Sequence, residues 1–290
     1  AETDFTMITT IMHIILNRLL ALSPLNMLRY KRLKRHVTVK HIDQEGFRFC
    51  YFTRGTPGPQ PSILMLHGFS LNKDIWLNIL KLFPKDLHVI CVDLPGHGDT
   101  TRFLGESYTI AAQAKRMHQF VEWTGLNKKP FHLVGMSMGG MVAGVYAANY
   151  PSEVCALSLL CPAGECQHPT DFFLRFRELV YSKEASDGTL VSMNEKEAEE
   201  LLELCLHQPN FIKRQVRSKV GFLDVSSAKS RYSLHDNMRR IRAPTQIIWG
   251  REDKVRVRCT GVLSQWAAMS GGQARLLLCL SLRLLLLPYV

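Results

Sequence analysis

Short apolar runs alternate with segments of helical composition through the first half of the chain. The runs are rich in β-branched and aromatic residues and cover residues 37–42, 47–53, 62–66, 88–92, 131–134 and 156–161. Strands that alternate with helices are typical of a parallel sheet with helices on its faces. The sequence therefore predicts an α/β fold, in which a mostly parallel central sheet is flanked by helices.

The alternation stops after residue 161 and resumes near residue 244. Residues 162–235 carry charged, helical sequence such as 194–204, and they contain little that resembles a buried strand. Apolar runs return at 244–250 and 273–279. We therefore predict a core in two parts, 37–161 and 236–279, with a helical cap inserted over 162–235 and an atypical leucine-rich tail over 280–290.

The first 36 residues form an apolar and basic segment. Residues 7–28 are long enough to cross a bilayer, but polar residues and a proline interrupt them: His13, Asn17, Arg18, Pro24 and Asn26. A basic cluster follows at Arg29, Lys31, Arg32, Lys34 and Arg35. This pattern favours a segment that lies on a membrane surface with anionic headgroups, with the following domain in the cytosol. A solvated amphipathic extension is the alternative.

Charge and cysteine content exclude two classes of protein. The formal net charge is +11, but residues 1–41 hold seven basic and two acidic residues, and residues 256–290 hold four arginines and no acid. Because the excess positive charge lies at the two ends, nucleic-acid binding is not predicted. The eight cysteines form no C-x-x-C pair. We expect reduced, structural thiols rather than a disulfide-bonded secreted scaffold.

One motif carries nucleophile chemistry. The segment Gly135-Met-Ser-Met-Gly139 follows an apolar strand and precedes residues of helical composition. A serine in G-x-S-x-G at a strand-to-helix turn is a nucleophile elbow, where the glycines leave room for a sharp turn. The helix that follows directs its first amides toward developing negative charge, so we expect the Met138 N–H to donate to an oxyanion beside Ser137.

Two further turns follow predicted strands. In Leu66-His-Gly-Phe, the turn would bring the Phe69 N–H over the same site as a second oxyanion donor, and His67 suits loop shaping better than catalysis. In Val92-Asp-Leu-Pro-Gly-His-Gly98, glycine and proline indicate a structural turn.

A carboxylate follows the returning strand in Trp249-Gly-Arg-Glu-Asp-Lys254. The order serine and then aspartate is that of α/β-hydrolases, so Asp253 is the candidate acid, with Glu252 as the alternative.

These motifs together resemble the membrane-anchored monoacylglycerol lipases of the α/β-hydrolase superfamily. The resemblance rests on residues 54–76, 91–98, 127–151 and 229–255, whereas the first 35 residues and much of the cap match poorly. It implies Ser137 as nucleophile, Phe69 and Met138 as oxyanion-hole amides, and Asp253 as the acid that orients a histidine. It also implies lipid ester substrates, no cofactor and no metal, and a membrane location with the hydrolase domain facing the cytosol, at late endosomes and lysosomes or at the plasma membrane.

The catalytic histidine of such an enzyme is not found after Asp253. The last of the eleven histidines is His235, and residues 280–290 read Leu-Ser-Leu-Arg-Leu-Leu-Leu-Leu-Pro-Tyr-Val. Serine needs an adjacent base, so we expect hydrolysis of lipid esters to be severely impaired unless His67 or His97 serves as a substitute. The alternative is a catalytically inactive homologue that binds a lipid or a partner; epoxide opening or dehalogenation is disfavoured because it normally places a carboxylate at the elbow.

Overall fold

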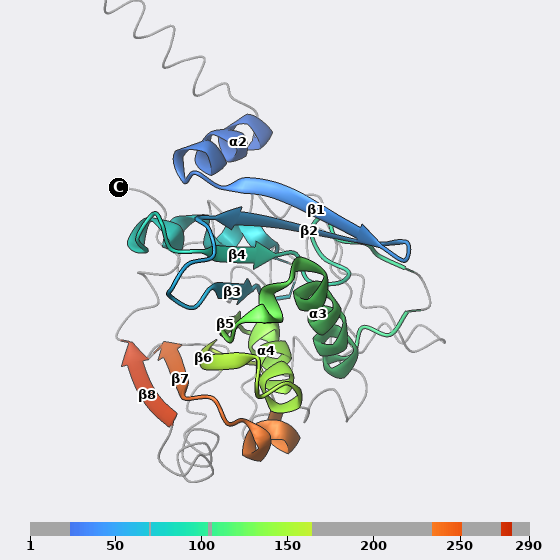
Figure 1. The fold of residues 1–290 in the computed structure, drawn as a ribbon, viewed down its shortest axis with the longest axis vertical. Coiled ribbons are helices and arrows are strands. Elements are labelled where there is room, and N and C mark those ends of the chain that lie inside the picture. Colours follow the sequence, from blue (N-terminus) through green and yellow to red (C-terminus); the bar gives the residue numbers. More distant parts are fainter. Residues whose placement is uncertain (1–23, 70, 104–105, 164–233, 251–273, 280–290) are drawn as a thin grey trace, which may run out of the picture. The chain divides into compact units, whose positions relative to one another are not determined.

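A computed structural model describes residues 24–69, 71–103, 106–163, 234–250 and 274–279 (Figure 1). The chain divides into two compact units, residues 1–37 and residues 38–290. The first unit contains helix α2 (Pro24–Lys34). Most of the N-terminal segment, most of the predicted cap and the whole leucine-rich tail lie outside the described residues, so these boundaries stay predictions.

The second unit is built on an eight-stranded sheet with the order β1-β2-β4-β3-β5-β6-β7-β8. Its strands are β1 (Thr38–Gln44), β2 (Phe47–Arg54), β3 (Ile63–Leu66), β4 (Val89–Val92), β5 (Phe131–Met136), β6 (Val154–Leu160), β7 (Thr245–Gly250) and β8 (Ala274–Cys279). Pairing is antiparallel for β1 with β2 and for β2 with β4, and parallel for every other neighbouring pair. The prediction of a mostly parallel sheet in an α/β fold is confirmed.

Most strand ends differ from the ends of the predicted runs by one or two residues. For example, β1 extends to Gln44 because it pairs with β2 through a tight hairpin, in which Glu45 and Gly46 both have positive φ, 51° and 76°. Two consecutive positive φ angles are typical of the hairpin turn that matches strand twist. Backbone pairing therefore continues past the point where apolar side chains stop.

Two α-helices lie against the sheet in the described part of this unit. Helix α3 (Ile110–Thr124) begins at Thr109, whose side chain accepts a hydrogen bond from the Ala112 amide, and ends at Gly125 with φ of 66°. Helix α4 (Met138–Asn149) is buried along nearly its whole length. The other described elements are a helical stretch over residues 234–237 and three 3₁₀ helices, η1 (Lys73–Leu82), η2 (Leu126–Lys128) and η4 (Met238–Arg240).

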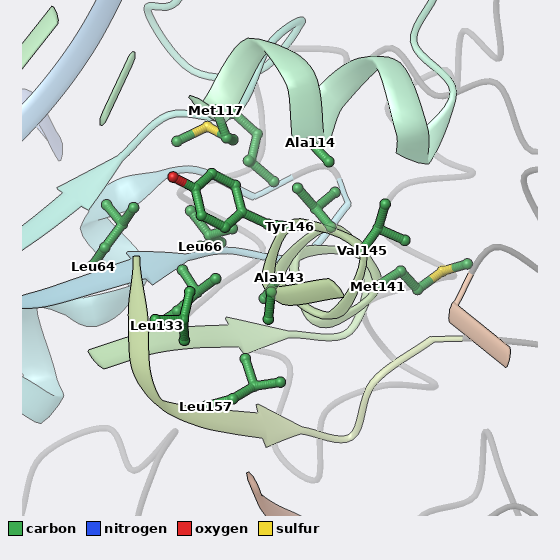
Figure 2. Close-up of a cluster of buried hydrophobic side chains, with 14 of the residues drawn as sticks. Leu64, Leu66, Ala114, Met117, Leu133, Met141, Ala143, Val145, Tyr146 and Leu157 are labelled. Atoms are coloured by element: carbon green, nitrogen blue, oxygen red, sulfur yellow. The ribbon is translucent and has the colours of Figure 1, made fainter. Parts of the chain in front are cut away.

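The core lies where α4 meets the sheet and α3. Figure 2 shows α4 side chains Met141, Ala143, Val145 and Tyr146 between strand residues on one side and α3 residues on the other. The facing side chains are Leu64, Leu66, Leu133 and Leu157 from the strands and Ala114 and Met117 from α3, and all are buried. A helix held on all sides in this way fixes the position of its first residue, which follows the elbow serine.

Among the described residues, Cys50, Cys91, Cys155 and Cys161 form no disulfide bond. Within the described segments, no helix combines the length and apolar character needed to cross a membrane.

Candidate active site

Ser137 lies at the junction of β5 and α4, as a nucleophile elbow requires. Its backbone has φ of 52° and ψ of −118°, a conformation that side-chain-bearing residues rarely adopt. Such a conformation costs about 1–3 kcal/mol and persists only where the surroundings enforce it. Here the Ser137 N–H donates to Leu160 O at 2.9 Å, and its carbonyl accepts from Gly140 N and Ala163 N, both at 2.9 Å.

The two glycines of the motif are required by close backbone contact. A Cβ atom on Gly135 would lie 2.3 Å from the carbonyl oxygen of Gly139. A Cβ atom on Gly139 would lie 2.3 Å from the carbonyl oxygen of His67 and 2.6 Å from that of Leu66. The elbow therefore packs directly on the end of β3, and only glycine allows this approach.

The hydroxyl of Ser137 remains available for chemistry. Ser137 is the N-cap residue of α4, yet its side chain makes no capping hydrogen bond, and the residue is half-buried. The first amides of a helix have no acceptor within the helix, and the helix dipole makes this end favourable for negative charge. The Met138 N–H is the first of these amides, which suits the expected oxyanion donor.

The turn after β3 lies beside the elbow. A Cβ atom on Gly68 would lie 3.3 Å from the Cβ of Ser137. Phe69 follows, half-buried, with its ring 5.8 Å from that of His97 in an edge-on contact. The structure thus brings Ser137, Met138 and the Gly68–Phe69 turn together.

His67 braces this turn and cannot serve as a base in this arrangement. Its Nδ1 donates to Gly68 O at 2.7 Å, and its Nε2 accepts from Leu94 N at 3.0 Å. The side chain is fully buried, and burial lowers the pKa of His67 to about 4, with the charge of Lys73 acting in the same direction. Both ring nitrogens are occupied, so neither can take the Ser137 proton.

His97 is equally buried but has one free nitrogen. Its Nδ1 donates to Pro95 O at 3.0 Å, whereas the buried Nε2 has no hydrogen-bond partner among the described residues. Burial lowers the pKa of His97 to about 3, and the neighbouring His67 adds to this effect. Its ring contacts those of His67 and Phe69. A base with so low a pKa is also poorly matched to neutral pH.

Asp253 and its alternative Glu252 lie outside the described residues. The strand that precedes them is in the expected place, because β7 pairs with β6 two positions from β5 in the sheet. The assignment of Asp253 therefore stays a prediction.

Sequence reasoning missed a buried ion pair next to the site. Lys73 Nζ lies 2.7 Å from Asp93 Oδ2, and the two side chains are 1% and 0% exposed. The only signal in the sequence is an aspartate that directly follows an apolar strand at residue 93, and nothing there identifies Lys73 as its partner.

Comparison with known proteins supports the same fold. A family described as the alpha/beta hydrolase fold matches residues 61–261. The chain belongs to this family. It is 49% identical over 241 residues to monoacylglycerol lipase ABHD6 of Bos taurus, and 48% identical to the Homo sapiens protein of that name, with 78% of this chain and 71% of each relative covered.

Solved structures agree on the fold. The crystal structure of a bacterial membrane phospholipase A superposes with a TM-score of 0.66 at 21% identity, covering 95% of this chain and 90% of that one. A thioesterase domain from the curacin biosynthetic pathway gives a TM-score of 0.60 at 19% identity over 84% and 92% of the two chains.

Proposed function

We propose that this α/β-hydrolase is a serine hydrolase of lipid esters of the monoacylglycerol type. The observation that carries the proposal is Ser137 at positive φ between β5 and α4, with an uncapped side chain and the first helix amide beside it. The relatives named monoacylglycerol lipase, at 48–49% identity, support the choice of substrate class.

The proposed reaction forms and then hydrolyses an acyl-enzyme. Ser137 Oγ attacks the ester carbonyl carbon, and the Met138 and Phe69 amides stabilise the negative charge that develops on the carbonyl oxygen. A base takes the serine proton and returns it to the departing glycerol oxygen. Water then attacks the acyl-serine by the same route, releasing the fatty acid and restoring Ser137.

No histidine of this chain is identified as the general base for Ser137. In this fold it is a histidine that follows the acid, yet none of the residues after Asp253 in the 290-residue chain is histidine. Both ring nitrogens of His67 are hydrogen-bonded, and a pKa of about 3 makes His97 a poor base at neutral pH. We infer that turnover by these 290 residues alone is severely impaired, with residual catalysis from the oxyanion site and substrate binding on the order of 10³–10⁴-fold over water.

The second candidate is an inactive homologue that binds lipid or a partner protein. It is favoured by one observation, the occupied nitrogens of His67 beside an otherwise well-formed elbow.

We further propose that helix α2 holds the protein at a membrane surface, where an apolar ester would be delivered. Arg29 and Lys34 on this helix are exposed, and Arg35 follows it. Basic side chains beside an apolar segment attract anionic headgroups.

The test is hydrolysis of a monoacylglycerol by the purified chain and by Ser137→Ala, each with and without free imidazole. Imidazole has a pKa near that of histidine and can act as the missing base. We expect little Ser137-dependent release of fatty acid without imidazole and a clear increase with it. Circular dichroism confirms that both proteins are folded.

Full Ser137-dependent activity without imidazole would show that a histidine within the chain is the base. The inferred impairment of turnover would then be wrong. Equal rates for the chain and Ser137→Ala under both conditions would refute the hydrolase proposal and leave the binding role.

A further inference from the structure

The buried Lys73–Asp93 pair organises the loop that follows β4. Asp93 Oδ1 accepts the Lys73 amide at 2.7 Å, and Oδ2 accepts Lys73 Nζ at 2.7 Å and the Asp99 amide at 2.8 Å. Burial opposes the charge on Lys73, but the nearby negative groups, above all Asp93 and Asp74, together raise the pKa of Lys73. Because removing two charges from water is costly, such a pair is weak evidence for stability alone. Its clear effect is to fix the position of Asp93.

This cluster is not a vacant cation site. Ligand atoms of Cys50, Asp93 and Asp99 lie close enough together to hold a metal ion. However, the Lys73 ammonium already lies 2.7 Å from Asp93 Oδ2 and 3.5 Å from Asp99 Oδ2. The positive charge that two carboxylates would attract is therefore supplied by the chain itself.

The main chain of Asp93 is fixed by a threonine. Thr100 is 2% exposed, and its hydroxyl donates to Asp93 O at 2.7 Å while accepting from Cys50 N at 3.0 Å. The carbonyl of Asp93 and the N–H of Leu94 belong to one planar trans peptide, so they point in opposite directions. Holding the Asp93 carbonyl toward Thr100 thus directs the Leu94 N–H away from it, toward His67 Nε2 at 3.0 Å.

The peptide between Gly68 and Phe69, closer to Ser137, is fixed in the same way. A backbone N–H can only donate and a carbonyl can only accept, so His67 must be neutral with its proton on Nδ1. That proton is donated to Gly68 O at 2.7 Å. The Gly68 carbonyl shares a peptide plane with the Phe69 N–H, the expected second oxyanion donor. Fixing the carbonyl on His67 therefore sets the direction of the Phe69 N–H.

From this continuous series we propose that Thr100 is a positioning residue for the oxyanion site, acting through the Asp93–Leu94 peptide and His67 on the Phe69 amide. This inference rests on the proposed serine-hydrolase function. The series runs Thr100 hydroxyl to Asp93 carbonyl, Leu94 amide to His67, and His67 to Gly68 carbonyl. Each hydrogen bond polarises the next, so the loss of one weakens the others.

Thr100→Val tests the proposal because it removes the hydroxyl and keeps the shape. Thr100→Ser restores the hydroxyl and is the rescue variant. Thr101→Val is the matched control, since Thr101 Oγ1 also makes two backbone hydrogen bonds, with Arg48 N at 2.8 Å and Arg48 O at 3.2 Å, but none to the series. All variants are made in the full chain, and urea denaturation compares their stabilities.

Two readouts are used. The first is the second-order rate of Ser137 phosphonylation by an alkyl fluorophosphonate, measured with imidazole present. Ser137 Oγ forms a bond to phosphorus, imidazole takes the serine proton, and fluoride leaves. Loss of an oxyanion donor costs on the order of 10²-fold, so we expect misdirection in Thr100→Val to slow the reaction by about 10-fold or more. We expect Thr100→Ser and Thr101→Val to stay within about 2-fold of the unmodified chain. The second is the nitrogen-15 spectrum of the His67 ring, which reports the position of its proton.

We expect Thr100→Val to be phosphonylated slowly and to lose the Nδ1–H form of His67. We expect Thr100→Ser and Thr101→Val to keep the rate and the Nδ1–H form of the unmodified chain. Equal rates for all labelled proteins, or equal slowing in Thr100→Val and Thr101→Val, would overturn the positioning role while leaving the hydrolase proposal intact. No labelling of the unmodified chain above Ser137→Ala with imidazole present would instead overturn the proposed function itself.

Discussion

Gly139 and His67 show at the residue scale why the elbow and the β3 turn form one unit. A Cβ atom on Gly139 would clash with the carbonyl oxygens of Leu66 and His67. Both oxygens belong to backbone that cannot move without displacing the turn. The position of the nucleophile therefore depends on a contact between segments about 70 residues apart in sequence.

We predict that Gly139→Ala lowers the free energy of unfolding by about 3 kcal/mol or more, because overpacking against backbone cannot be relieved by a rotamer change. Gly58→Ala is the control, since its Cβ would meet nothing closer than 3.9 Å. Urea denaturation of both variants measures the difference. Equal stabilities would mean that the elbow can shift away from β3, contrary to the geometry described above.

The residue types of the elbow could be predicted from sequence, but the series from Thr100 to Phe69 could not. The spacing G-x-S-x-G describes a local turn, and a strand before it and a helix after it confirm the context. The contacts of Thr100 with Asp93 and of Lys73 with Asp93 depend on how a loop closes in space, and no short motif records that.

At the element scale, α2 combines exposed basic residues with an exposed apolar residue. Arg29 and Lys34 are exposed, and Leu33 between them is 73% exposed. The last turn of α2 holds Lys31, Arg32 and Lys34. Exposed basic and apolar groups on one short helix suit contact with a headgroup layer.

We predict that the double change Arg29→Glu/Lys34→Glu weakens binding to phosphatidylserine vesicles more than 10-fold, from about 1 kcal/mol per basic residue. Cosedimentation measures the bound fraction. Lys81→Glu/Lys129→Glu is the charge-matched control, because both lysines are exposed in the second unit. If the two double variants lost equal affinity, total charge and not α2 would govern the interaction.

On the scale of the whole molecule, buried neutral histidines link folding to pH. Burial lowers the pKa of His67 to about 4 and that of His97 to about 3, and it also lowers the pKa of His88 and His132. In the unfolded chain these groups bind protons near pH 6.5. Below that pH the unfolded state holds more protons than the folded state, so acid favours unfolding.

We predict that the free energy of unfolding is nearly constant above pH 7 and falls between about pH 6.5 and pH 4. Each buried histidine contributes up to about 1.4 kcal/mol per pH unit in that window. Urea denaturation at a series of pH values gives the slope, and His97→Gln should reduce it, whereas exposed His41→Gln should not. A flat profile from pH 7 to pH 5 would contradict this.

The sheet itself was largely predictable, because β3 and β4 are uninterrupted apolar runs and most residues of β5 and β6 are apolar. Strand order was not, because it depends on crossovers: β3 lies between β4 and β5, and β7 adds beside β6 from residues 245–250. The sequence of the cap predicted over residues 162–235 contains no clear strand pattern, so its internal structure could not be predicted. The assignment of Asp253 depends on the loop after β7.

The direct pairing of β6 with β7 has a consequence for how this fold can diversify. Leu157 pairs with Thr245 and Leu160 with Ile248, although residues 161–244 separate the two strands in sequence. Closing a longer connection costs only about 0.6 kcal/mol for each doubling of its length. An intervening segment can therefore gain or lose residues at small thermodynamic cost while β6, β7 and the β5–α4 turn that holds Ser137 keep their positions.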